Sequence, residues 1–137
     1  MSRSVVIFDP VPNHFKLMCV LLVSRGYHVL TFPCEGMASA QLESLQPDLF
    51  IVGCLKGYIQ NELDIIRKLR AQPATAAIPI LICSTGIETL QTLVERLNLE
   101  GLVLLGKPFT ATDFLAAVQQ TLNVASLTSS VQTISSS

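Results

Sequence analysis

The sequence predicts one α/β domain built on a parallel sheet. Five short apolar runs recur along the 137 residues, and segments with helical spacing separate them. The runs lack the apolar and polar alternation of a half-exposed strand, as expected for strands that are buried on both faces. Strands and helices that alternate five times imply right-handed crossovers, with helices on both faces of the sheet. The runs are Val5–Phe8, Val29–Phe32, Leu49–Val52, Ile80–Cys83 and Leu102–Leu105.

The spacing of apolar residues predicts helices between these runs. The first helix, at about 13–25, ends before Gly26, whose freedom to adopt φ > 0 suits a helix stop. A second helix is predicted at 36–46, before Pro47, and a third at about 60–71. The inward residues of the first helix should be Phe15, Met18, Cys19 and Leu22. In the third helix, Leu63, Ile66 and Leu69 should point inward, whereas Arg67, Lys68 and Arg70 should point outward.

Two cap signals predict where the fourth and fifth helices begin. Thr85 and Thr110 are each followed three residues later by a carboxylate, the spacing of a capping box. After a domain of residues 1–124, the uncharged and serine-rich segment 125–137 is expected to be a flexible tail or a linker stub. The apolar stripes are Leu90, Leu93, Val94 and Leu97 in the fourth helix, and Phe114, Leu115, Val118 and Leu122 in the fifth.

Charge and composition exclude several classes of function. Nine Lys and Arg against ten Asp and Glu give a net charge of −1, with no basic stripe to attract nucleic acid. No apolar stretch approaches the roughly 20 residues of a membrane span, and the apolar core of a secretory signal is absent. Four scattered cysteines without a Cys-x-x-Cys pair suit reduced core thiols. We therefore expect a cytoplasmic protein that binds neither nucleic acid directly nor membranes.

Short motifs in order along the chain, over about residues 3–124, resemble the receiver domain of bacterial two-component response regulators. They are Val5-Val6-Ile7-Phe8-Asp9, Gly26-Tyr27, Pro47-Asp48-Leu49, Ile78-Pro79-Ile80 and Lys107-Pro108-Phe109. The resemblance implies the flavodoxin-like fold, a (βα)5 three-layer sandwich whose five-stranded parallel sheet has the order 2-1-3-4-5. Open α/β sheets place their sites at the carboxyl ends of the strands.

The residues at those strand ends indicate a vestigial receiver pocket. The resemblance implies two adjacent acidic residues after the first strand, where this chain has Asp9 and Pro10. It implies a phosphoryl-accepting aspartate after the third strand, where this chain has Gly53. Ser84 and Lys107 match the hydroxyl and the lysine of the family pocket. Because one carboxylate then faces one lysine, we expect no cofactor and weak or absent Mg²⁺ binding.

Ordinary structural roles explain the same residues. Asp9 and Lys107 would form an ion pair at the end of the sheet, and Ser84 would be a strand-end hydroxyl bonded to the backbone. Phosphoryl transfer depends on positioning and charge neutralisation, so losing the acceptor and the metal together should remove the reaction. We therefore predict no catalytic residues and no enzymatic activity.

An inert pocket leaves the surfaces of the domain as the functional feature. The resemblance implies signalling through the fourth helix, the fifth strand and the fifth helix, with Leu104 in place of the usual aromatic switch residue. No charged residue follows Asp113, so we expect a less polar contact. The partner would be a histidine kinase, an output domain, another signalling protein or a second copy of the chain. The expected face comprises Leu90, Leu104, Ala116, Gln119, Gln120 and Asn123.

Two alternatives from other functional classes stay open. A receiver with an atypical acceptor would need tight metal binding by Asp9 and backbone oxygens. A small-ligand sensor would use a neutral cleft left by Gly53 and the missing carboxylates, although no Gly-rich phosphate loop lies near Asp9. Mass analysis after exposure to a phosphodonor would test the first, and a cleft at Gly53 would support the second.

Overall fold

The apolar runs form the strands of a parallel sheet in the computed structural model. The structure describes residues 3–9, 15–33, 38–54, 59–84, 92, 95, 101–106, 109–124 and 132–134. The strands are β1 (Ser4–Asp9), β2 (His28–Pro33), β3 (Leu49–Cys54), β4 (Ile80–Ser84), β5 (Leu102–Gly106) and β6 (Gln132–Ile134). The helices are α1 (Lys16–Ser24), α2 (Ser39–Glu43), α3 (Ile59–Ala71) and α5 (Ala111–Val124).

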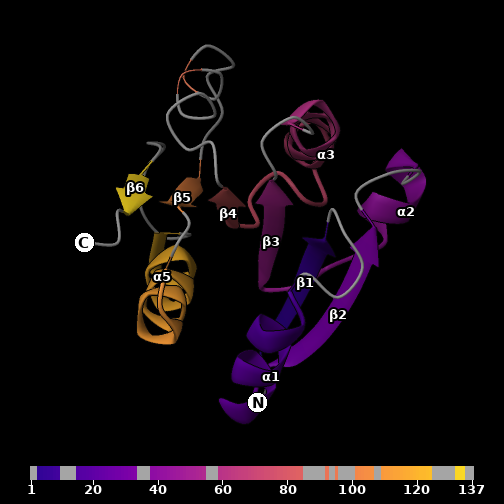
Figure 1. Cartoon of the computed structure of the whole chain (residues 1–137). Helices are drawn as coiled ribbons and strands as arrows, with labels where there is room; N and C mark the ends of the chain where they lie inside the picture. The colour runs from indigo at the N-terminus through magenta and orange to yellow at the C-terminus, as the bar shows by residue number, and fades with distance from the viewer. Residues whose placement is uncertain are drawn as a thin grey trace.

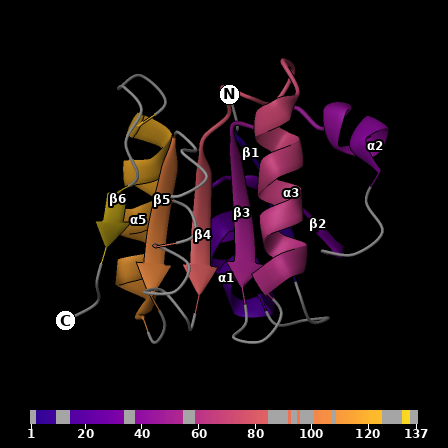
Figure 2. The same ribbon diagram turned by 90° about the horizontal axis from the view of Figure 1, so that it is seen from above.

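The sheet has the order β2-β1-β3-β4-β5-β6, and its paired strands run parallel. Helices α2 and α3 cover one face, and α1 and α5 cover the other (Figures 1 and 2). The predicted five-stranded order 2-1-3-4-5 of the flavodoxin-like fold is confirmed. Within the described ranges, no helix is both long and apolar enough to span a membrane.

Alternation along each strand divides the core into two clusters. Phe8, Phe50 and Val52 pack on the α3 side of the sheet, whereas Ile7 and Ile51 pack on the α1 and α5 side. Because helices cover both sides of the central strands, side chains that point either way lose contact with water, which explains the near-continuous apolar runs.

Strand β2 departs from the predicted burial on both faces. Its side chains are exposed or half-buried, and Leu30 is 46% exposed. The reason is its place at the edge of the sheet, where it pairs with β1 alone. In addition, α2 spans only Ser39–Glu43 and is shorter than the predicted 36–46, of which residues 36 and 37 lie outside the described part.

Local signals in the sequence set the ends of α1 and α5. Gly26 has a φ of +89°, as predicted for the stop after α1. The backbone N–H of Asp113 donates to Thr110 Oγ1 at 3.0 Å, and the backbone N–H of Thr110 donates to Asp113 Oδ2 at 3.1 Å. The predicted capping box of α5 is therefore confirmed. The matching signal at 85–88 lies outside the described residues, although Thr92 and Glu95 are helical.

Arg70 on α3 does not point outward as predicted. Its guanidinium donates to the carbonyl oxygens of Ile78 at 2.7 Å and Gly101 at 3.1 Å. These carbonyls lie just before β4 and β5, so one cation satisfies backbone acceptors in two loops. The predicted outward position of Arg67 is confirmed, since its side chain is 49% exposed and lies 3.5 Å from Asp64.

Strand β6 adds a sixth strand that the sequence analysis did not foresee. Gln132, Thr133 and Ile134 pair in parallel with Val103, Leu104 and Leu105 of β5 (Figure 2). The unpaired edge of β5 is a template for another strand, and β-branched residues such as Thr133 and Ile134 favour extended structure. These three residues therefore differ from the flexible tail expected for 125–137; the rest of that segment lies outside the described residues.

Candidate functional site

The register of the sheet places Asp9, Gly53 and Ser84 along one end of the sheet, where strands β1, β3 and β4 finish. Phe8 pairs with Val52, and Cys54 pairs with Ser84, so the ends of β1, β3 and β4 are level. Since all three strands are parallel, this end of the sheet is formed by their carboxyl ends. Pro10 and Lys107, the other members of the vestigial pocket, lie outside the described residues, so the Asp9–Lys107 ion pair stays a prediction.

Asp9 has a structural role at the start of α1. The backbone N–H of Phe15 donates to Asp9 Oδ2 at 2.9 Å, and Phe15 is the residue from which α1 begins. The carboxylate therefore ties the end of β1 to the entry of the first helix. This bond uses an oxygen lone pair that a metal ligand would offer to a cation.

The thiol of Cys19 interacts electrostatically with the carboxylate of Asp9. Burial raises the pKa of the Cys19 thiol, and the negative charge of Asp9 raises that pKa further. A raised pKa keeps the sulfur protonated at neutral pH, and only the thiolate is a good nucleophile. Neither Cys19 nor Cys83 forms a disulfide, consistent with the predicted reduced cysteines.

Gly53 and Ser84 are both buried. Alternation along β3 directs position 53 to the α1 and α5 side, the side of Leu49 and Ile51. The same alternation along β1 directs Asp9 to the side of Val5 and Ile7, which is the same side. Position 53 and Asp9 are therefore neighbours across β1 and β3, but only Asp9 has a side chain to present.

The structure describes five of the six residues of the expected interaction face, and one of these five is not on the surface. Leu104 is fully buried in the cluster on the α3 side, so its side chain cannot belong to an exposed face. Leu90 lies outside the described residues. The four residues on α5, which are Ala116, Gln119, Gln120 and Asn123, are all exposed.

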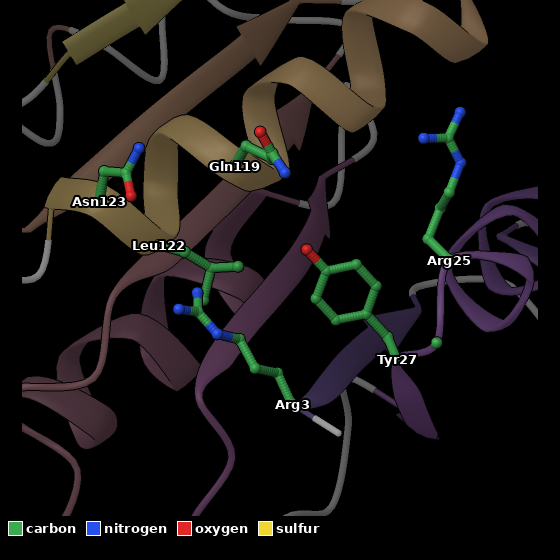
Figure 3. Close-up of a pocket in the computed structure, with 7 residues that line it drawn as sticks. Arg3, Arg25, Tyr27, Gln119, Leu122 and Asn123 are labelled. Atoms are coloured by element: carbon green, nitrogen blue, oxygen red, sulfur yellow. The ribbon is translucent and has the colours of Figure 1, made fainter. Parts of the chain in front are cut away.

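Two cavities that the sequence analysis missed lie between α5 and the turn from α1 to β2. One has a volume of about 340 Å³ and the other about 410 Å³. Figure 3 shows the first, where Tyr27 lies near α5 and Arg3 approaches from the start of β1. They lie at the amino ends of β1 and β2, away from Asp9. The first is lined by Arg3, Arg25, Gly26, Tyr27, Gln119, Leu122 and Asn123, and the second by Arg25, Tyr27, Thr112, Leu115, Ala116 and Gln119.

Helix α1 has exposed apolar residues on its outer side, a surface feature that the sequence analysis did not predict. Leu17, Val20 and Val23 recur every three residues and are 64%, 57% and 59% exposed. The signal was present in the sequence, because Lys16–Ser24 is apolar on almost every side. A helix that is apolar all round but covered on one side only leaves an apolar outer surface.

Comparison with known proteins identifies the fold. No family model matches the sequence, and no curated protein is significantly similar to it. Among solved structures, the chemotaxis response regulator CheY4 of Vibrio cholerae has a TM-score of 0.73 at 19% identity, covering 88% of this chain and 99% of that one. The receiver domain of a sensor histidine kinase from Pseudomonas aeruginosa, solved with magnesium in its active-site cleft, has a TM-score of 0.69 at 19% identity, with coverages of 90% and 99%.

A third similar structure is the signal receiver domain of a modulated diguanylate cyclase from Desulfovibrio desulfuricans. Its TM-score is 0.70 at 22% identity, covering 93% of this chain and 98% of that one. At these identities the likeness establishes the receiver fold.

Proposed function

We propose that this chain is a receiver-like signalling domain that acts through protein contacts and does not need phosphorylation. The observation that carries the proposal is Gly53, a buried glycine at the end of β3. In the family that the sequence resembles, the matching position accepts the phosphoryl group through a carboxylate. A glycine has no side chain that could form an acyl phosphate bond.

Magnesium binding is not part of the proposal, because the donors at this edge do not suit the ion. The described side chains at these strand ends offer the carboxylate of Asp9 and the hydroxyl of Ser84. Mg²⁺ prefers oxygen ligands in near-octahedral geometry and is usually held by one or two carboxylates together with phosphate. The one carboxylate already accepts a hydrogen bond from the backbone of Phe15.

The proposed role is that of a binding protein in a two-component or phosphorelay pathway, without enzymatic activity. The similar solved structures include receiver domains of sensor histidine kinases, which makes a signalling protein a natural partner class. The exposed apolar residues of α1 and the neutral exposed residues of α5 are suitable contact surfaces. A cytoplasmic location belongs to the proposal, since free thiols suit a reducing compartment.

No specific observation favours either alternative function, the receiver with an atypical acceptor or the small-ligand sensor. An atypical acceptor would need a metal held by Asp9, whose carboxylate is bonded to the start of α1. A small-ligand sensor at the vestigial pocket would need a cleft there, and the two cavities described above are not lined by Asp9, Gly53 or Ser84.

Exposure to a small phosphodonor tests the proposal. We expect no species heavier by one phosphoryl group after incubation with acetyl phosphate and Mg²⁺, because position 53 has no acceptor side chain and the described strand ends offer the ion a single carboxylate. The measurement is intact-mass spectrometry, with an active receiver domain in the same reaction as a positive control. A phosphorylated form of this chain that accumulates with the control would contradict the proposal.

A further inference from the structure

The two cavities beside α5 share Arg25, Tyr27 and Gln119 in their linings, so we treat them as one groove, called the α5 groove. Its α5 side follows Thr112, Ala116, Gln119 and Asn123, which recur at the spacing of one helical face. Eleven helical steps at about 1.5 Å each give this side a length of roughly 16 Å. The opposite side is formed by Arg3 and the turn at Arg25, Gly26 and Tyr27.

The lining of the α5 groove is positively charged. The described residues that line the groove include two arginines and no acidic residue. Both arginines are exposed, and the ion pair found within the described ranges is that of Arg67 with Asp64 on α3, away from the groove. The carboxylates of Asp48 and Asp113 accept hydrogen bonds from the backbone N–H groups of Ser4 and Thr110, and neither residue is part of the lining. The groove therefore favours an anionic occupant.

The arrangement of the arginines favours an extended ligand over a small anion. Figure 3 shows Tyr27 between Arg3 and Arg25, with its hydroxyl directed toward α5. Arg25 lines both cavities, whereas Arg3 lines only the one at the Asn123 end. A ligand that fills both cavities therefore has to extend along α5 past Tyr27. An extended peptide of about five residues, at roughly 3.3 Å per residue, matches the length of the groove.

We propose that the α5 groove binds an extended acidic peptide segment of a partner protein, with two carboxylates held by Arg3 and Arg25. Guanidinium groups bind carboxylates through paired hydrogen bonds, and the ring of Tyr27 offers a surface for an intervening side chain. Gly26 and Ala116 are small, which lets a peptide backbone approach the walls. This inference rests on the proposed function and names the surface and the partner chemistry for it.

The test is an amide NMR titration of the full chain with a short capped peptide of sequence Asp-Glu-Leu-Glu-Asp. We expect saturable shifts at Gly26, Tyr27, Ala116 and Gln119. Arg25→Glu and Arg3→Glu should each weaken binding by about tenfold or more, because each removes a charge-assisted contact. Arg67→Glu is the matched control, since it changes an exposed arginine on α3 and should leave the affinity unchanged.

Several results would overturn the inference. One is an absence of saturable shifts at millimolar peptide. Another is equal binding of an uncharged control peptide, Asn-Gln-Leu-Gln-Asn, which replaces each acidic residue by its amide. A third is an equal loss of affinity in Arg67→Glu. Saturation of the groove by inorganic phosphate, with no response to the peptide, would also reject a peptide occupant. A phosphodonor reaction on the same sample separates the two claims: a silent groove on a chain that is not phosphorylated rejects only this inference, whereas phosphorylation rejects the proposed function.

Discussion

Replacing Gly53 with aspartate is expected to make the stability of the protein depend on Mg²⁺. Position 53 and Asp9 lie on adjacent strands and on the same face of the sheet, and neighbouring strands are about 4.8 Å apart. Two carboxylates at about 5 Å repel each other by roughly 3 kcal/mol at an effective dielectric constant of 20. Without a cation, the variant should therefore unfold at a lower temperature than the natural chain.

Magnesium should reverse this loss in the Gly53→Asp variant alone. Two carboxylates side by side approach the ligand set that Mg²⁺ prefers. An ion at 100 times its dissociation constant stabilises the folded state by about 2.7 kcal/mol. The measurement is thermal unfolding with and without Mg²⁺, and Gly53→Asn is the control because it adds a similar shape without the charge. An equal response of the natural chain or of Gly53→Asn to Mg²⁺ would contradict this account of the pocket.

Replacing Phe50 with alanine is expected to remove a large part of the stability of the fold. Phe50 is fully buried in the interior strand β3, and its ring stacks on Phe8 with centroids 5.9 Å apart. Truncating a buried phenylalanine costs about 3–5 kcal/mol, and a domain has only about 5–15 kcal/mol in total. Urea unfolding of the variant should show a much lower midpoint with an unchanged slope.

Phe32→Ala is the matched control for the core. Phe32 also contacts Phe8, at 6.3 Å between centroids, but it is only partly buried on the edge strand β2. Its loss should cost less, about 1–2 kcal/mol, because less apolar area returns to water. If both variants lost the same stability, the assignment of β3 to the centre and β2 to the edge would be wrong.

Periodicity along the chain was enough to predict the layers of this fold. The inward residues of α1 and α3 and the capping box of α5 depend on neighbours within a few positions, so local patterns reveal them. The exposure of Leu30 was beyond such patterns, because an apolar run does not say whether its strand lies inside the sheet or at its edge. Arg70 was misplaced for a similar reason: its partners are the carbonyls of Ile78 and Gly101, far along the chain.

The candidate site was predictable in one part and not in another. Asp9, Gly53 and Ser84 each follow a strand, and parallel strands bring their ends together, so the edge could be foreseen. The α5 groove joins Arg3, the turn at Gly26 and the outer face of α5, three segments that only the folded chain brings together. Its arginines stand singly in the sequence and form no motif.

Amide NMR during addition of Mg²⁺ and then beryllofluoride, a mimic of an aspartyl phosphate, tests the central claim most directly. Beryllofluoride needs an aspartate oxygen at the acceptor position and a bound metal. Position 53 is a glycine, and the proposal gives the pocket no metal. We expect the signals of Asp9, Gly53, Ser84 and Lys107 to stay unchanged through both additions. Saturable, Mg²⁺-dependent shifts at these residues would show that a working receiver site survives, and phosphorylation-independent action would then be wrong.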